Sequence, residues 1–184
     1  MGTTSKQVMD IKTSKGLSQT SNEELRAWTD KGWEQAMREG NYDRSREHRN
    51  FEVQKGGIVT PIDKKRPLTE RMAENLASRG IKDPNEGLAE PRFRTVVNFI
   101  FGGSTDRMRE LAFGNQVVGF ESKGGNEHVR RMPEIEEWAR DIYRFVADKY
   151  GEENIISFIV HCDEKNPHAV SYTHLRPTRQ AEIS

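Results

Sequence analysis

The sequence contains few of the features that stabilise secreted or membrane proteins. Cys162 is the single cysteine among 184 residues, so no disulfide can form within the chain. A lone cysteine fits a reducing compartment, and we expect a cytoplasmic protein. No apolar run approaches the roughly 20 residues that span a bilayer, and the first residues lack the apolar segment of a signal peptide. These absences argue against a disulfide-stabilised secreted domain and against an integral membrane protein.

The chain also lacks a net charge, because 29 lysine and arginine residues balance 29 aspartate and glutamate residues. Dedicated nucleic-acid-binding proteins are usually basic overall, so this balance counts mildly against that class. Basic residues are nevertheless clustered at residues 44–49, 64–66 and 128–131. With 33% hydrophobic residues, the chain has enough apolar side chains for the core of one ordinary domain, together with long polar segments.

Apolar periodicity and turn residues predict a mixed order of strands and helices. Alternating or continuous apolar runs predict strands over residues 7–13, 50–53, 93–101 and 155–160. Apolar spacings of three and four residues, bounded by caps and glycines, predict helices over residues 21–37, 69–79, 104–113 and 133–150. This order indicates an α+β fold in which helices pack on one face of an antiparallel sheet.

The most informative segment runs from His161 to His168 and reads His-Cys-Asp-Glu-Lys-Asn-Pro-His. It follows the apolar run 155–160, and its middle residues have the composition of a turn. We therefore expect His161 to end one strand and His168 to begin the next, so that both imidazoles reach one face. Two converging imidazoles can bind a divalent metal, with Glu164 as a nearby acid. The alternative interpretation is a pair of surface histidines on a polar turn.

Together with the segment Arg46-Glu-His-Arg-Asn-Phe-Glu52, this histidine motif resembles the Mob/Pre family of plasmid mobilization relaxases, also called plasmid recombination enzymes. The resemblance extends over residues 7–169. It implies an antiparallel palm related to the two-histidine rolling-circle endonucleases. Further segments are similar to the Bacteroides-type branch of the family, namely residues 82–87, residues 94–98 and the helix around Trp138.

The resemblance also implies an activity. A relaxase of this family nicks one strand at a plasmid transfer origin and stays attached to the 5′ end through a covalent phosphoryl bond. We therefore expect a metal-dependent DNA strand transferase that serves conjugative mobilization and plasmid recombination. Its partners would be single-stranded or hairpin origin DNA and other mobilization or coupling proteins. By this resemblance His161 and His168 would bind Mn²⁺ or Mg²⁺, and Glu164 would orient the site or transfer a proton.

Two positions depart from the family pattern. Relatives usually continue Pro-His-x-His, but the position of this third metal ligand is Val170 here, so we expect weak metal binding. Relatives also carry Asn-His-x-x-Arg on the first helix, where the histidine attacks phosphorus. The matching residues here put Glu23 at the nucleophile position and Arg26 at the arginine. Tyr42 and His48 are the alternative nucleophiles.

Contacts with DNA are expected from the basic clusters, in particular from Arg46, Arg49 and Asn50. Binding of this kind depends steeply on salt, because bound phosphates release counterions. Two other functions stay open. One is a catalytically impaired protein of the same fold that binds the origin or single-stranded DNA, and the other is a small metal-dependent hydrolase.

The end of the sequence predicts a domain boundary. Residues 1–169 are expected to form a truncated relaxase catalytic domain. Residues 170–184 are polar, are interrupted by Pro177 and lack the apolar strand that the family implies. We expect them to be an atypical tail of foreign origin that fills only part of a strand, around residues 169–175.

Overall fold

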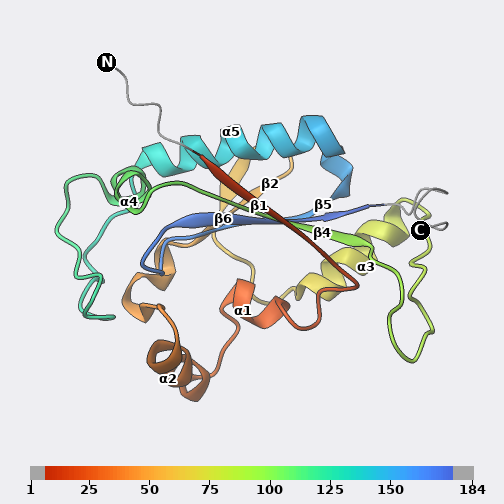
Figure 1. Cartoon of the computed structure of the whole chain (residues 1–184), viewed down its shortest axis with the longest axis horizontal. Helices are drawn as coiled ribbons and strands as arrows, with labels where there is room; N and C mark the ends of the chain where they lie inside the picture. Colours follow the sequence, from red (N-terminus) through yellow and green to blue (C-terminus); the bar gives the residue numbers. More distant parts are fainter. Residues whose placement is uncertain (1–6, 176–184) are drawn as a thin grey trace.

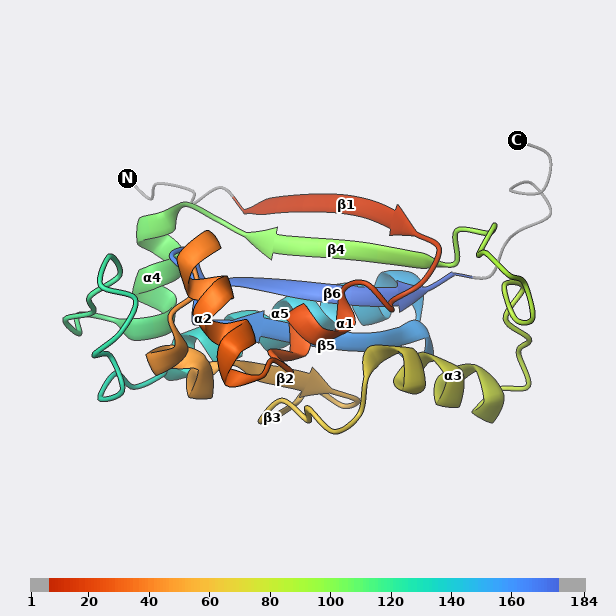
Figure 2. The same ribbon diagram turned by 90° about the horizontal axis from the view of Figure 1, so that it is seen from below.

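The computed structural model describes residues 7–175, which form one six-stranded sheet in which every pairing is antiparallel. The strand order across the sheet is β1-β4-β6-β5-β2-β3, which Figure 2 shows face on. The strands are β1 (Val8–Ser14), β2 (Phe51–Gln54), β3 (Ile58–Thr60), β4 (Val96–Gly102), β5 (Ile155–His161) and β6 (His168–His174).

Helices cover both faces of this sheet (Figure 1). The helices are α1 (Ser21–Leu25), α2 (Asp30–Glu39), α3 (Leu68–Ser78), α4 (Thr105–Phe113) and α5 (Pro133–Tyr150), with 3-10 turns η1 (Arg44–Arg49) and η2 (Glu152–Asn154). The long helix α5 and α4 lie on one face, whereas α1 and α3 lie on the other. The predicted antiparallel α+β fold is confirmed, but its helices are not confined to one face.

The apolar pattern of the central strands explains why both faces are covered. Alternate residues of β5 belong to different cores: Phe158 packs with the helix α5 cluster, and Ile159 packs with the α1 and α3 cluster. β4 and β6 divide their side chains in the same way. A strand that is apolar on both faces must be buried on both. The three central strands therefore require a second helical layer.

The first predicted helix, over residues 21–37, is two helices with a break between them. Arg26 ends α1 in the left-handed backbone region, with φ at 53°. Thr29 then caps α2, where its side chain accepts a hydrogen bond from Gly32 N at 3.1 Å. A left-handed arginine is uncommon and persists where surrounding contacts fix it. The contacts of the Arg26 side chain, described below, provide that constraint, and no local sequence pattern reports them.

The strand expected around residues 169–175 is β6, which runs from His168 to His174 as a central strand between β4 and β5. Its residues from Ala169 to His174 are all buried. Among its polar side chains, Ser171 has a partner within the sheet, because its Oγ donates to Ser157 O at 3.3 Å. The remainder of the predicted tail, residues 176–184, lies outside the described part of the chain.

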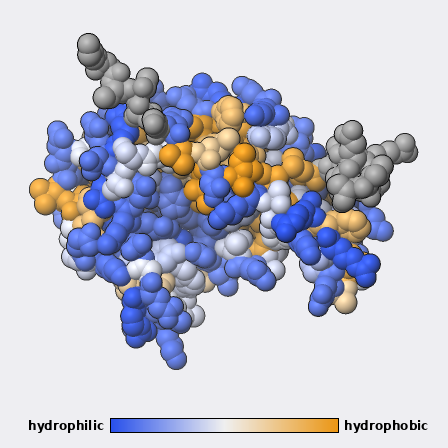
Figure 3. Space-filling model, in the orientation of Figure 1, coloured by the Kyte–Doolittle hydropathy of each residue, from blue (hydrophilic) through white to orange (hydrophobic). Residues whose placement is uncertain are grey.

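Apolar side chains on the surface gather along β1, at one edge of the sheet (Figure 3). Val8, Met9 and Ile11 of this strand are 58%, 44% and 49% exposed. Within residues 7–175, no helix combines the length and the apolar character that crossing a membrane requires.

Candidate active site

The two histidines of the motif lie directly opposite each other at the same end of the sheet. β5 ends at His161, β6 begins at His168, and the two residues are cross-strand partners. Their ring centroids are 5.5 Å apart. The Glu164 carboxylate joins them from the connecting turn, and one ligand atom from each of the three residues lies within 4.8 Å of the others. The predicted convergence of the two imidazoles is confirmed, and we call these three residues the His–Glu–His group.

Each imidazole has one nitrogen held by a backbone carbonyl. His161 Nε2 lies 2.8 Å from Glu24 O, and His168 Nδ1 lies 2.9 Å from Asn166 O. Because a carbonyl only accepts, these nitrogens carry protons. His161 Nδ1 is buried without a hydrogen-bond partner, and His168 Nε2 lies 4.0 Å from Glu164 Oε1.

The protonation of His161 also suits a metal ligand. Burial, followed by the charge of Arg26, lowers the pKa of His161 well below its ordinary value, so the ring is neutral. A neutral imidazole oriented by a carbonyl, with an unpaired buried nitrogen beside a carboxylate, is the arrangement found around bound metals. The residues of the His–Glu–His group therefore fit a divalent cation with nitrogen and oxygen ligands.

The turn between the histidines is held by side chains from η1 and the residue after it. Cys162 N donates to Asn50 Oδ1 at 2.6 Å, and Arg46 donates to Cys162 O at 2.5 Å and to Glu164 O at 3.2 Å. Arg46 is fully buried and Asn50 is 4% exposed. Both residues therefore support the turn. The DNA contacts predicted for them stay predictions, and the burial of the Arg46 guanidinium counts against its contact with a phosphate.

Arg26 connects α1 to the same turn. Its Nε and Nη2 donate to the two carboxylate oxygens of Asp163 at 2.9 and 3.0 Å, and Nη2 also donates to Glu164 Oε1 at 2.6 Å. Burial would raise the pKa of Asp163, but the charge and hydrogen bonds of Arg26 outweigh it, so this pKa lies below its ordinary value. Arg26 therefore engages Asp163 and holds the Glu164 carboxylate beside the histidines.

Glu23 lies on the same side of the sheet and pairs with a tyrosine. Tyr42 Oη donates to Glu23 Oε1 at 2.5 Å. The Tyr42 ring lies 4.6 Å from the Arg26 guanidinium and packs edge-on against Trp28 with centroids 5.1 Å apart. Since Arg26 also bonds Glu164, the Glu23–Tyr42 pair lies next to the His–Glu–His group. Among the candidate nucleophiles, Glu23 and Tyr42 are thus near this group.

An open groove of about 380 Å³ adjoins the site. Glu164 and His168 line it together with Asn41, the neighbour of Tyr42, and with Asp10 from the edge strand β1. The groove gives a ligand outside the protein access to two members of the His–Glu–His group.

Glu24 and Tyr172 also belong to the site, and the sequence did not single them out. Glu24 Oε1 accepts a hydrogen bond from Tyr172 Oη at 3.1 Å, and Glu24 Oε2 lies 3.7 Å from His161 Nε2. Burial raises the pKa of Glu24 to about 7, against the opposing effects of Arg26 and the Tyr172 hydrogen bond. In the sequence Glu24 is one of two acids in a first helical turn. Only the tertiary pairing of β6 with α1 distinguishes it from its neighbour.

Val170 occupies the position where the family pattern has its third histidine. It is two residues beyond His168 on β6, so its side chain faces the same side of the sheet. Val170 is 3% exposed and packs in the apolar cluster with Ile159 and Tyr172. The site therefore has a buried apolar side chain at the position where the family pattern has a histidine ligand.

A separate basic pocket of about 490 Å³ lies between η1 and the loop before α5. Arg49, Arg130 and Arg131 line it with His48, and Glu136 is its one acid. Arg49 Nε is bonded to a backbone carbonyl, and Arg131 pairs with Glu136 at 2.7 Å. The alternative nucleophile His48 thus faces a different pocket from the His–Glu–His group. Of the three predicted DNA contacts, Arg49 and Asn50 line this pocket and Arg46 does not.

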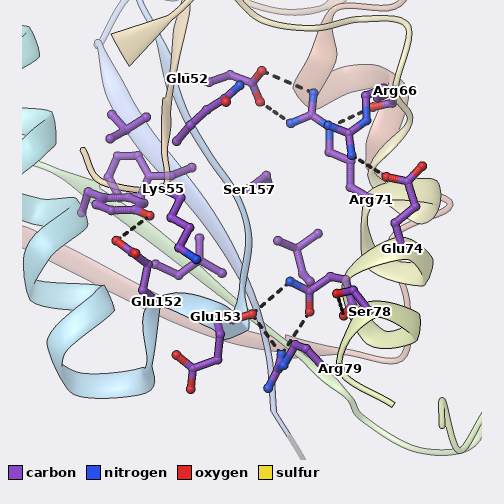
Figure 4. A pocket seen from close by; sticks show the side chains of 17 residues that line it. Glu52, Lys55, Arg66, Arg71, Glu74, Ser78, Arg79, Glu152, Glu153 and Ser157 are labelled. Carbon is purple, nitrogen blue, oxygen red and sulfur yellow. Dashed lines mark hydrogen bonds and ion pairs between the residues drawn. The ribbon is translucent and has the colours of Figure 1, made fainter. Parts of the chain in front are cut away.

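A further pocket of about 500 Å³ lies at the opposite end of β5 (Figure 4). Its charged groups are largely paired with one another. Arg71 bonds Glu52, Arg66 bonds Glu74 at 2.5 Å, and Tyr143 donates to Glu152 at 3.2 Å. We call it the β5-start pocket.

Comparisons with known proteins agree with the predicted family. Residues 127–179 match the family model described as plasmid recombination enzyme, Mob_Pre. This match passes Ala169, which corrects the expectation that the resemblance ends there. A comparison with curated proteins found no match. Membership of the Bacteroides-type branch and a foreign origin for residues 170–184 stay predictions.

Solved structures share the fold. The MobM relaxase domain (MOBV; Mob_Pre), in an Mn-bound crystal structure with a 22-nucleotide plasmid pMV158 oriT DNA carrying a 3′ thiophosphate, aligns with a TM-score of 0.57 and 17% identity over 98% of this chain and 74% of that chain. A second MobM structure, also Mn-bound and with 22-nucleotide oriT DNA, aligns with a TM-score of 0.55 and 16% identity over 98% of this chain and 75% of that chain. At these identities the likeness establishes the fold. The chain therefore has the fold of a MobV-type relaxase domain and, over residues 127–179, the sequence pattern of the plasmid recombination enzyme family.

Proposed function

We propose that this protein is a metal-dependent relaxase. It nicks one DNA strand at a plasmid transfer origin and keeps the 5′ end through a covalent phosphoryl bond, for mobilization and plasmid recombination. The observation that carries the proposal is the His–Glu–His group, whose ligand atoms converge within 4.8 Å beside an open groove. The fold supports it as well, because the MobM domains of similar fold are bound to origin DNA and Mn.

The metal in this proposal is Mn²⁺ or Mg²⁺, held by His161, His168 and Glu164. Imidazole nitrogen with carboxylate oxygen suits Mn²⁺, and Mg²⁺ prefers oxygen ligands and water. When bound, the cation polarises the scissile phosphate and offsets the charge that develops on its oxygens. With Val170 in place of a third histidine, we expect binding weaker than about 1 μM.

The surrounding residues prepare this site. Arg26 holds the Glu164 carboxylate through a 2.6 Å hydrogen bond, so Glu164 needs no rearrangement before it acts. Glu164 orients the site or transfers a proton. Glu23 occupies the nucleophile position of the family pattern and contributes its carboxylate to the reaction. Both Arg26 and Glu23 approach from the α1 side.

The DNA is single-stranded or hairpin origin DNA, and its backbone contacts the protein at Arg49 and Arg130 in the basic pocket. This pocket has three arginines and one glutamate, so its net charge favours phosphate. Partnership with other mobilization or coupling proteins stays a prediction. A cytoplasmic location does too, and it agrees with a DNA substrate and with the free thiol of Cys162.

A second function is a protein of the same fold that binds the origin without cleaving it. Two observations favour it: Val170 stands where a ligand is expected, and the nucleophile position holds Glu23. Such a protein would bind DNA without forming a covalent bond.

A nicking assay separates the two functions. Supercoiled plasmid carrying the DNA that flanks this gene would be incubated with the protein and Mn²⁺, Mg²⁺ or EDTA, and DNA binding would be measured by fluorescence anisotropy. A relaxase converts the plasmid to open circles with Mn²⁺ and not with EDTA, and His168→Ala abolishes conversion while DNA binding persists. Binding without conversion under all conditions would support the non-catalytic function instead.

A further inference from the structure

We propose that the Tyr42 hydroxyl is the nucleophile of this chain and that the Glu23 carboxylate accepts its proton. The inference rests on the proposed relaxase function and goes beyond it, because the residue at the nucleophile position becomes a base and a residue outside that position becomes the attacking group. The resulting covalent bond is a phosphotyrosine ester.

The position of Tyr42 carries the inference. Its hydroxyl is bonded to Glu23 at 2.5 Å, and its ring lies 4.6 Å from the guanidinium that also bonds Glu164 at 2.6 Å. One chain of contacts therefore joins the phenol, Arg26 and the His–Glu–His group. The neighbouring residue Asn41 lines the groove with Glu164 and His168, so the chain at Tyr42 borders the same opening.

The surroundings of the ring fix its orientation. Tyr42 packs edge-on against Trp28, which packs edge-on against Trp33 with centroids 5.0 Å apart. The buried Arg26 guanidinium lies over the ring. A hydroxyl on a ring held in this way keeps a defined position, which a nucleophile requires.

The hydrogen bond also assigns the roles within the pair. Burial, followed by the bond to Glu23, raises the pKa of Tyr42, so the phenol stays protonated and needs a base when it attacks. Glu23 is the carboxylate in contact with that proton. Direct attack by Glu23 would instead give an acyl phosphate, a mixed anhydride that water hydrolyses readily. A tyrosine ester would preserve the bond for rejoining the strand.

The chemical step is a transesterification. The Tyr42 oxygen forms a bond to the scissile phosphorus as the bond from phosphorus to the 3′ oxygen breaks. The phenolic proton passes to Glu23, and the departing 3′ oxygen takes a proton from water. Glu23 returns its proton to solvent, so one phosphodiester replaces another without an oxidant or reductant.

The chain contains a matched tyrosine pair that serves as a control. In the β5-start pocket Tyr143 donates to Glu152 at 3.2 Å, and its pKa is likewise raised, by burial and by that glutamate. Tyr143 lies on α5, on the opposite face of the sheet from α1. The variants Tyr143→Phe and Glu152→Gln therefore remove the same groups from a pair away from the His–Glu–His group.

The test is the identity of the covalent bond formed by the unchanged protein. The protein would be incubated with Mn²⁺ and the nicked origin DNA, digested, and its DNA-linked peptide identified by mass spectrometry. A Tyr42 peptide is expected, with a link that survives both hydroxylamine, which cleaves acyl phosphates, and mild acid, which cleaves phosphohistidine. This measurement needs no variant and is independent of any folding defect.

The variants then test the two roles. Tyr42→Phe should reduce adduct formation at least about 10³-fold, and Glu23→Gln should slow it about 10²-fold while the link stays on Tyr42. Both control variants should form adduct at the unchanged rate. A link on a Glu23 or histidine peptide, or an adduct that persists in Tyr42→Phe, would overturn the inference and leave the relaxase function standing. Absence of any adduct and any nicking with the unchanged protein would overturn both.

Discussion

The two ends of β5 are both polar, and they differ in what their charged groups contact. In the β5-start pocket, which reaches the Ile155 end, the buried carboxylate Glu52 is bonded to Arg71 (Figure 4). At the His161 end, buried acceptor atoms lack donors: His161 Nδ1 has no hydrogen-bond partner, and neither does Glu24 Oε2. The pocket at the first end is larger, about 500 Å³ against about 380 Å³ for the groove. Pocket size therefore does not identify the functional end.

The two ends of β5 differ in the free energy that a bound ligand would recover. In a buried, fully bonded ion pair, the attraction between the two charges offsets the free-energy cost of removing them from water. Such a pair has little remaining affinity for a ligand. A buried lone pair without a donor costs free energy, about 1–3 kcal/mol, until something binds it. A cation between His161, His168 and Glu164 would remove that cost. The His161 end therefore has a physical reason to bind a metal, whereas the bonded Glu52–Arg71 pair of the β5-start pocket does not.

The largest expected effect comes from breaking the buried arginine pair at each end. Arg26→Met leaves Asp163 unpaired, and Arg71→Met leaves Glu52 unpaired, so each should lower the free energy of unfolding by about 3–5 kcal/mol. Arg26→Met should also weaken Mn²⁺ binding at least about tenfold, because Glu164 loses its support. Urea denaturation and calorimetry measure the two effects. Equal losses of Mn²⁺ affinity in both variants would remove the distinction between the ends.

The next effect is a gain. Val170→His should restore the third ligand, since Val170 lies on the strand and face of His168. We expect Mn²⁺ affinity to rise at least about tenfold, or about 1.4 kcal/mol. Without metal the variant should melt at a lower temperature than the parent, because an imidazole replaces a buried methyl-rich side chain. Calorimetry that finds unchanged affinity would show that this position does not reach the cation.

The smallest effect concerns DNA. Arg130 lines the basic pocket and makes no ion pair within residues 7–175, so Arg130→Ala should remove one phosphate contact. The slope of log affinity against log salt should fall by about 1. Lys55→Ala, in the β5-start pocket, is the matched loss of one cation and should leave that slope unchanged. Anisotropy titrations at several salt concentrations measure both slopes, and equal slopes for the two variants would contradict a phosphate contact at Arg130.

The sequence was sufficient to predict the hairpin that presents the histidines, because the apolar run and the turn residues act locally. It was not sufficient for contacts made across the fold. Arg26 breaks the first helix because its side chain reaches Asp163, which is 137 positions away in the chain. The pairing of Tyr42 with Glu23 depends in the same way on how α1 and the chain before η1 pack together.

Burial also places inside the fold several residues that look exposed in the sequence. Arg46 and Asn50 were predicted to contact DNA because their types and spacing suit it. Their burial against the backbone of the turn is a tertiary property that composition does not reveal. Ser171 and Thr173 likewise look like surface residues, whereas both are fully buried within the central sheet.

The central claim is that the His–Glu–His group is the metal centre, and titration of the protein with Mn²⁺ by isothermal calorimetry tests it most directly. The account predicts one Mn²⁺ per chain with a dissociation constant above about 1 μM, and at least about a hundredfold weaker binding in His168→Ala. Arg71→Met, at the other end of β5, should bind as the parent does. Submicromolar binding that survives His168→Ala would contradict the account.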